Sequence, residues 1–330
     1  MSRVLVSVLA AVLAMGVLSP AAMAQPSPPD KKPPVSFGVR PANAAGPDSR
    51  TQFTYTATPG GVFHDFISVE NISDQPLRLR VDASDAFNTP EGGFDLRARG
   101  VQNTDIGLWI KSGKDEIEVQ PKSKVTVPFD IQVPANAGPG DHTGGVVASL
   151  TTQQTSADGS KVAVDQRVGS RVYMRVTGEL KPQLTVERFD GTYRHSWNPF
   201  GSGSAEVGYT VRNTGNVRLA ADQRLRVETP VSDGTEITGL PKVPELLPGN
   251  EFTLRRSVDG VGPWFFLTGR VHLDPIAPKG LQTPTLRPVN ASTDFEAMPW
   301  SQLIILLTLV IAVLLYLRLR RPSTVEAPDA

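Results

Sequence analysis

A run of apolar residues near the C-terminus, from Trp300 to Arg321, sets the strongest limit on the topology of this chain. It holds no charged residue between Trp300 and Leu317, and from Leu303 onward it is almost wholly Leu, Ile, Val and Ala. As a helix this uncharged run would extend roughly 27 Å, which is close to the roughly 30 Å hydrocarbon core of a bilayer. The run therefore predicts a transmembrane helix over residues 300–317.

The residues that flank this run predict its orientation. Aromatic residues stand near both ends, as is typical of membrane interfaces, and Arg318, Arg320 and Arg321 follow immediately. Because basic residues remain on the cytoplasmic side of a span, residues 318–330 are predicted to be a cytoplasmic tail. A core helix of a soluble domain is the alternative, but only a short tail follows to form such a domain.

The N-terminus has the features of a secretory signal peptide. Arg3 supplies a positive charge, Val4–Leu18 is apolar, and Ala22-Met23-Ala24 is a site of the small-x-small type that signal peptidase cleaves. We therefore expect a signal peptide over residues 1–24 and a mature single-pass type I membrane protein. Residues 25–34 are polar and Pro-rich, so they are predicted to form a flexible arm.

Composition excludes several functional classes. The chain has no cysteine, so disulfides, thiol nucleophiles and cysteine-based metal centres are all excluded, and the ectodomain must be stabilised by its cores. Basic and acidic residues balance at 33 each, so the chain has no net positive charge that would favour the binding of nucleic acid. Abundant Ala, Pro and Arg favour a bacterial source, so the predicted span would lie in a bacterial cell membrane; an ectodomain in the cell wall space is what the family resemblance given below implies.

Alternating apolar and polar residues predict strands throughout the ectodomain. The clearest case is residues 77–83, in which Leu, Val and Ala alternate with Arg and Asp. Residues 125–133 alternate in the same way, but Pro128 cannot donate to a ladder, so that strand is expected at an edge or with this position facing solvent. The polar run 151–165 is either a hairpin loop or a domain boundary.

An internal repeat predicts two domains of one kind. Residues 69–79 and 211–219 both contain a strand end, a turn led by Asn, and a second alternating strand. We therefore expect an all-β protein with two tandem Ig-like β-sandwich domains followed by one transmembrane α-helix. The predicted ranges are 35–165 for the first Ig-like domain, 166–274 for the second, and 275–299 for a Pro-rich stalk.

Catalytic and metal-binding patterns are not found in the sequence. The four histidines stand in separate segments without the spacing of metal ligands. Asp141 and His142 are adjacent, but neighbouring residues of an extended chain point to opposite sides, so they are not expected to form a dyad. The chain is therefore predicted to be no enzyme and to need no cofactor or metal ion.

Two segments are candidates for binding. Residues 138–145 contain four glycines and include His142, Gly144 and Gly145, so a loop that shapes a ligand site is one hypothesis, and a tight turn needed only for folding is the other. Trp197 and Phe200 stand in a loop-like stretch. They are either anchors for a partner protein or plugs that fold into the end of the second core.

Several short motifs of the first domain, in their order along the chain, resemble the WxL-interacting protein family. The motifs are Phe37-Gly38-Val39-Arg40-Pro41, Tyr55, Pro59-Gly60-Gly61, Val69-Glu70-Asn71-Ile72-Ser73, Ala86-Phe87-Asn88-Thr89, Gly92-Gly93, Val133-Pro134 and Gly144-Gly145-Val146-Val147. The resemblance covers about Val35 to Leu150. It implies a peptidoglycan-binding Ig-like domain, a second Ig-like domain that binds a partner or host protein, and a C-terminal membrane anchor.

Two functions are therefore considered. The first is a non-enzymatic, membrane-anchored cell-envelope protein that binds peptidoglycan and presents a surface protein, of which a WxL-type protein is one candidate. The alternative is a structural stalk or a chaperone-like assembly module that binds only proteins, through exposed strand edges.

The predicted topology can be tested by protease protection. Protease added to intact cells or protoplasts is expected to digest the chain before Trp300 and to spare an epitope tag placed after Ala330, because the arginines that follow the span stay in the cytoplasm. Cleavage of that tag from outside would contradict the topology.

Overall fold

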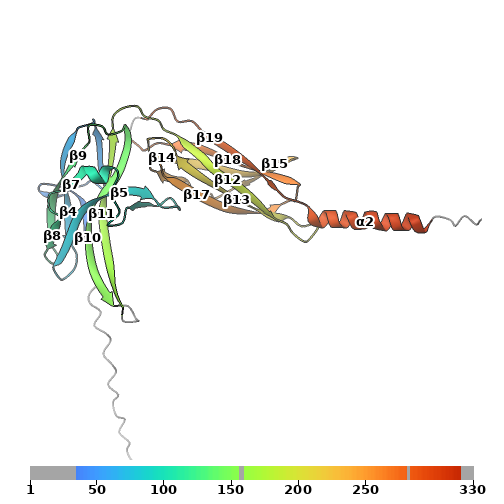
Figure 1. Ribbon diagram of the computed structural model, residues 1–330, viewed down its shortest axis with the longest axis horizontal. Coiled ribbons are helices and arrows are strands. Elements are labelled where there is room, and N and C mark those ends of the chain that lie inside the picture. The colour runs from blue at the N-terminus through green and yellow to red at the C-terminus, as the bar shows by residue number, and fades with distance from the viewer. Residues whose placement is uncertain (1–34, 156–159, 281–282, 321–330) are drawn as a thin grey trace, which may run out of the picture. The chain divides into compact units, whose positions relative to one another are not determined.

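The computed structural model describes residues 35–155, 160–280 and 283–320. It contains two immunoglobulin-like β-sandwich domains followed by one apolar C-terminal helix (Figure 1), so the predicted all-β fold class is confirmed. The predicted signal peptide (1–24), the predicted arm (25–34) and the tail residues 321–330 lie outside the described residues.

The first sandwich is built from eleven strands and one short helix. They are β1 (Phe37–Asn43), β2 (Gly46–Pro47), β3 (Phe53–Ala57), β4 (Val62–Asn71), β5 (Leu77–Asn88), β6 (Phe94–Leu96), α1 (Ile106–Trp109), β7 (Ile110–Ser112), β8 (Glu116–Val119), β9 (Lys124–Gln132), β10 (Gly140–Thr155) and β11 (Lys161–Val176). One sheet has the order β2-β1-β4-β9-β7, and the other has the order β3-β11-β10-β5-β6, with β8 also paired to β5. Phe53 and Phe129 meet between the sheets, with 5.1 Å between ring centroids.

The second sandwich has eight strands and leads into the helix. They are β12 (Leu184–Arg194), β13 (Gly203–Asn213), β14 (Leu219–Thr229), β15 (Ser232–Ile237), β16 (Val243–Leu246), β17 (Glu251–Val261), β18 (Phe266–Ile276), β19 (Val289–Glu296) and α2 (Trp300–Leu319). The sheets have the orders β12-β13-β17 and β15-β14-β18-β19, with β16 paired to β14. Val207, Tyr209, Leu225 and Leu267 belong to their common core.

The boundaries between the parts differ from the predicted ones. β11 pairs with β10 along its whole length, so the first sandwich ends at Val176 and not at residue 165. Within this polar run, residues 151–155 and 161–165 are therefore paired strands of the first sandwich, and the run is not a domain boundary. The predicted stalk 275–299 contains β19, which pairs with β18 over residues 289–296. Small polar side chains in β19 conceal its alternation in the sequence.

The helix α2 has the properties of a membrane span by length and composition. It has 20 residues with a mean hydropathy of 2.5, and none of its side chains is buried in the protein. At roughly 1.5 Å per residue it extends about 30 Å. It begins at Trp300, as predicted, and continues to Leu319.

Pro128 does not place its strand at an edge, and the second alternative of the prediction holds, because Pro128 is exposed. β9 lies inside its sheet, between β4 and β7. β7 ends at Ser112, opposite Phe129, and the next amide, that of Gly113, donates to the carbonyl oxygen of Pro128 at 2.9 Å. The regular ladder has therefore ended where the missing proline N–H would have been needed.

One buried asparagine is repeated in each sandwich, at the turn that the sequence repeat marks. Asn71 donates to the carbonyl oxygens of Gln75 and Val119 at 2.8 and 2.9 Å, and its side-chain oxygen accepts the amide of Ser73. Asn213 makes the equivalent three bonds, to Val217, Leu246 and Gly215. Both asparagines are fully buried, so each one satisfies backbone groups that water cannot reach.

We expect Asn213→Ala to lower the free energy of unfolding by about 3 kcal/mol, because two carbonyl groups and one amide lose their partner in the core. Chemical denaturation of the full chain measures this change. Asn43→Ala is the matched control, since Asn43 makes the same type of turn bond to Ala45 on the exposed surface. The control is expected to cost less than about 0.5 kcal/mol. Equal effects of the two substitutions would contradict the role given to burial.

Candidate functional site

The hairpin of β10 and β11 leaves one strand edge open. Each strand has 16 residues, and the two pair throughout, whereas β3 pairs with β11 only over Val172–Val176. Among the described residues, no strand pairs with the other edge of β11 over Lys161–Arg171. The hairpin extends beyond its neighbouring strands (Figure 1). Its backbone N–H and C=O groups along this edge are therefore available to another strand.

An apolar strip accompanies this free edge. Val162, Val164 and Val168 alternate on the side of β11 that continues into the buried Val172 and Met174. Val162 is 47% exposed, and the other two of the three are partly exposed. An added strand would thus find both hydrogen-bonding groups and an apolar surface.

A cleft of about 540 Å³ lies beside the free edge. It is lined by residues 39–41 of β1, residues 48–52, and Gly169, Ser170 and Arg171 of β11. β1 pairs with β2 only at its last two residues, and the carbonyl oxygen of Pro41 accepts the amide of Asp48, so in the part of the chain that the structure describes no strand pairs with this edge over residues 37–40. The hydroxyl of Ser170 is buried and has no hydrogen-bond partner. The cleft is therefore bordered by two open edges, one from each sheet.

Arg50 forms the charged floor of this cleft. Its guanidinium contacts Asp48 at 2.7 Å and Asp65 at 2.6 Å, and Tyr55 donates its hydroxyl to Asp65 at 2.6 Å. Burial opposes the ionisation of Asp65, but the bonds from Arg50 and Tyr55 outweigh it and lower the pKa of this carboxyl. Arg40 and Arg171 also line the cleft, and the guanidinium of Arg40 is paired with Glu70 at 3.1 Å.

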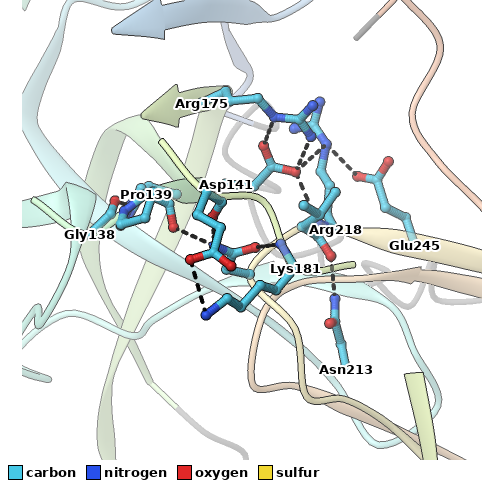
Figure 2. Close-up of polar contacts among 12 residues, drawn as sticks. Gly138, Pro139, Asp141, Arg175, Lys181, Asn213, Arg218 and Glu245 are labelled. Atoms are coloured by element: carbon cyan, nitrogen blue, oxygen red, sulfur yellow. Dashed lines mark hydrogen bonds and ion pairs between the residues drawn. The ribbon is translucent and has the colours of Figure 1, made fainter. Parts of the chain in front are cut away.

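The two sandwiches are joined around the buried carboxylate of Asp141, which Figure 2 shows. Both of its oxygens accept bonds from the guanidinium of Arg175, at 2.7 and 2.8 Å. One of them also accepts the backbone amide of Arg218, from the second sandwich, at 2.9 Å. The guanidinium of Arg218 lies 3.9 Å from the ring centroid of Tyr173 and 3.8 Å from Glu245. Asp141, Arg175 and Arg218 are each less than a tenth exposed, so the junction is closed to water.

Backbone contacts surround this ion pair. The amide of Asp141 donates to the carbonyl oxygen of Asn216 at 2.8 Å, and the side chain of Asn216 donates to Pro139 at 2.8 Å. Gly140 has a φ of +124°, and a Cβ atom there would lie 2.3 Å from the Asn216 oxygen. Glycine at this position therefore allows the two sandwiches to approach closely.

A second set of contacts lies around Asn88 at the end of β5. Its side-chain oxygen accepts the amide of Leu247 at 2.8 Å, and its side-chain amide donates to Glu245 at 2.9 Å. Its backbone amide donates to the side chain of Asn250 at 2.9 Å. Two separate groups of hydrogen bonds therefore connect the sandwiches, and neither was predicted from the sequence.

His142 lies next to Asp141 and makes its contacts within the first sandwich. Its Nδ1 lies 2.6 Å from a carboxylate oxygen of Asp105, its Nε2 lies 2.9 Å from the carbonyl oxygen of Gly138, and its ring packs on Trp109. Asp141 instead binds the two arginines, so the two adjacent residues form no dyad, as predicted. Both contacts of His142 are acceptors, and only the imidazolium can donate to both of them. Burial lowers the pKa of His142, but the Asp105 contact outweighs this effect and raises the pKa.

The glycines proposed for a ligand loop lie elsewhere. Gly144 and Gly145 are buried within β10, which begins at Gly140, so the prediction of a loop over 138–145 is wrong for residues 140–145. A Cβ atom at Gly144 would lie 2.6 Å from the Ser84 oxygen, and one at Gly145 would lie 2.7 Å from the side chain of Leu96. Their lack of side chains thus serves packing. A role in ligand binding stays a prediction.

Trp197 and Phe200 do not plug the core of the second sandwich. Trp197 is 76% exposed and Phe200 is 96% exposed. The loop that carries them instead touches α2, where Gln302 donates to the carbonyl oxygen of Pro199 at 2.7 Å. The core-plug alternative is therefore wrong, and the surface alternative remains.

A second cleft, of about 420 Å³, is lined by residues of β5, β8 and β10 and by Arg99. Arg78, Arg80 and Arg99 face it together with Ser149 and Thr151, opposite Glu116 and Glu118. Burial raises the pKa of the nearby Asp82, although arginines at 167, 80 and 99 oppose this shift. Within the described ranges no group of three or more metal-binding side chains is found.

No protein-family model matches the chain, and no curated protein matches it in sequence. Similar solved structures include one from a chaperone and tip adhesin complex of CFA/I fimbriae biogenesis, at 8% identity, covering 78% of this chain and 98% of that chain, with a TM-score of 0.39. The class 5 fimbriae chaperone CfaA is 9% identical, and the match covers 78% of this chain and 98% of that chain, with a TM-score of 0.38. The CupB2 chaperone of Pseudomonas aeruginosa is 10% identical, and the match covers 76% of this chain and 99% of that chain, with a TM-score of 0.29. The likeness is one of general fold.

The raised pKa of His142 predicts a pH-dependent stability. A group whose pKa is higher in the folded protein contributes its full stabilisation below the unfolded pKa of about 6.5, and this contribution is lost as the pH rises through the folded pKa. The difference in unfolding free energy between wild type and His142→Gln is therefore expected to be largest near pH 5.5 to 6 and to shrink in alkaline buffer. Denaturant titrations across this range measure it. A difference that grows with pH would contradict the assignment.

Proposed function

We propose that this protein is a membrane-anchored binding protein of the bacterial envelope, in which the first sandwich captures an extended segment of another protein. The observation that carries this proposal is the unpaired edge of β11 over Lys161–Arg171, with the open edge of β1 across the cleft. The proposal assigns no catalysis. The apolar helix α2 would hold the protein in the membrane as a single-pass type I anchor.

Strand addition suits this edge physically. A captured segment would pair with the free N–H and C=O groups of β11 and place alternate side chains on Val162, Val164 and Val168. The edge also carries charged residues, Lys161, Asp165 and Arg167, which discourage pairing between copies of the protein. A specific partner would need to be complementary to these charges.

Peptidoglycan binding is the second candidate function, and the arginine-lined cleft favours it. Arg78, Arg80 and Arg99 could pair with carboxylates of a wall peptide, since guanidinium groups bind carboxylates in a bidentate manner. The resemblance to WxL-interacting proteins suggests both activities in one chain, and suggests a WxL-type surface protein as the partner. We retain these identities as proposals.

The main proposal is tested by photo-crosslinking of the full chain in its own membrane. A photoreactive residue at Val168 is expected to form one defined protein adduct. Val164→Asp, on the apolar strip, is expected to lower its yield about tenfold, which corresponds to about 1.4 kcal/mol. Ala163→Asp is the matched control, because it puts the same charge on the opposite face of the same strand, and it is expected to leave the yield nearly unchanged.

The outcomes separate the two functions. Absence of a protein adduct, or equal loss in both variants, would overturn the strand-addition proposal. Sedimentation of the full chain with purified peptidoglycan, reduced by Arg80→Gln together with Arg99→Gln and not by Val164→Asp, would support wall binding instead.

A further inference from the structure

The exposed aromatic side chains of the second sandwich are gathered at one of its ends. Outside α2, every Trp or Phe that is largely exposed in the described residues lies in two loops. Trp197 and Phe200 stand between β12 and β13, and Trp264, Phe265 and Phe266 stand at the β17 to β18 connection, with exposures from 37% to 96%. Monomeric proteins seldom expose so many large aromatic residues together, which indicates that this end of the second sandwich contacts another molecule or a membrane.

Strand register shows that these loops lie at the same end. Arg194 at the end of β12 is paired with Ser204, and Gly203 is paired with Val261 at the end of β17. On the other sheet, Phe266 is paired with Glu296, the last residue before the segment that leads to α2. The turn after β14 comes to this end as well, and its Val231 is 70% exposed. Three connections and the start of the helix therefore share one end of the sandwich.

Hydrogen bonds tie these loops to the first turn of α2. Gln302 donates to the carbonyl oxygen of Pro199 at 2.7 Å, and Ser301 donates to that of Ser196 at 3.4 Å. The amide of Ala297 donates to Phe265 at 3.2 Å. Trp197 and Phe200 flank these contacts, so they lie at the level of residues 301 and 302. That level is one or two residues further along the helix than Trp300, which was assigned to the membrane interface.

We propose that Trp197, Phe200, Val231, Trp264, Phe265 and Phe266 form an aromatic collar that docks into the headgroup region of the outer bilayer surface. This inference rests on the proposed membrane anchoring by α2. A lipid surface is the expected occupant because the collar adjoins the start of the apolar helix, at the depth where that helix would enter the bilayer. A protein partner would not explain why the aromatic residues lie at that depth. Aromatic rings with polar edges favour this interfacial layer.

The collar would limit the tilt of the second sandwich on its anchor. A single span with a short linker leaves an ectodomain free to rotate about the membrane normal and to lean in any direction. Contacts made by three connections at the end where the helix begins would oppose leaning, because each lean would lift some aromatic side chains out of the interface. The first sandwich would then be presented to its partner in a restricted range of orientations.

The test uses the full chain in nanodiscs that contain lipid brominated near the headgroup end of the acyl chains. The four tryptophans are Trp109, Trp197, Trp264 and Trp300, and single-tryptophan variants keep one each by replacing the other three with Phe. The emission of Trp197 and Trp264 is expected to be quenched to the same extent as that of Trp300. Trp109, which is 8% exposed and packs on His142, is the internal control and is expected to show no quenching.

The outcomes distinguish the collar from the anchor. If Trp300 is quenched while Trp197 and Trp264 are quenched only by aqueous acrylamide, the collar is refuted and the anchor stands. If Trp300 is not quenched, the anchor and the collar both fail. Should Trp109→Phe prevent folding, Trp197→Phe and Trp264→Phe in the wild-type background keep the test open. Each is then expected to remove part of the lipid-quenched emission, and an unchanged quenched fraction would overturn the collar.

Discussion

The carboxylate of Asp141 is the interaction on which the arrangement of the two sandwiches depends. A buried charge is costly unless it is paired and hydrogen-bonded, and Asp141 meets this requirement only through both domains. Arg175 neutralises it from within the first sandwich, and the backbone of Arg218 completes it from the second. Separation of the domains would leave the carboxylate with fewer bonds, so the junction favours one relative placement.

The same junction connects several local features that would otherwise be independent. The carboxylate of Asp85 accepts the amides of Thr104, Asp105 and Gly107, which holds the turn that becomes α1. Asp105 then binds His142, whose other nitrogen contacts Gly138, next to the residue that binds Asn216. His142 is thus connected, through Gly138 and the adjacent Pro139, to a residue that bonds to the second sandwich.

The two sandwiches differ in which of their strand edges and ends are free to bind another molecule. The second is bounded by the junction at one end and by α2 at the other, and β14 alone, with 11 residues, extends about 36 Å between those ends at roughly 3.3 Å per residue. The first keeps the free edge of β11 and its cleft. This division suits a protein whose second sandwich positions the first relative to the membrane, while the first sandwich binds the partner, as proposed above.

Periodicity and composition were enough to predict the strands with clear alternation, the repeat and the apolar helix, because each of these depends on local patterns of side chains. The asparagines at 71 and 213 stood out for this reason, and both occupy equivalent buried turns.

Tertiary structure alone decided which strands pair and which segments pack against one another. Residues 151–165 are polar and were ambiguous, because a hairpin that extends past its sandwich has no core face to impose alternation. Gly144 and Gly145 resembled a loop but lie in a strand, because the need for glycine came from Ser84 and Leu96, which are distant in sequence. Trp197 and Phe200 were placed on the surface by contacts with α2 from more than a hundred residues away, and no local pattern encodes that contact.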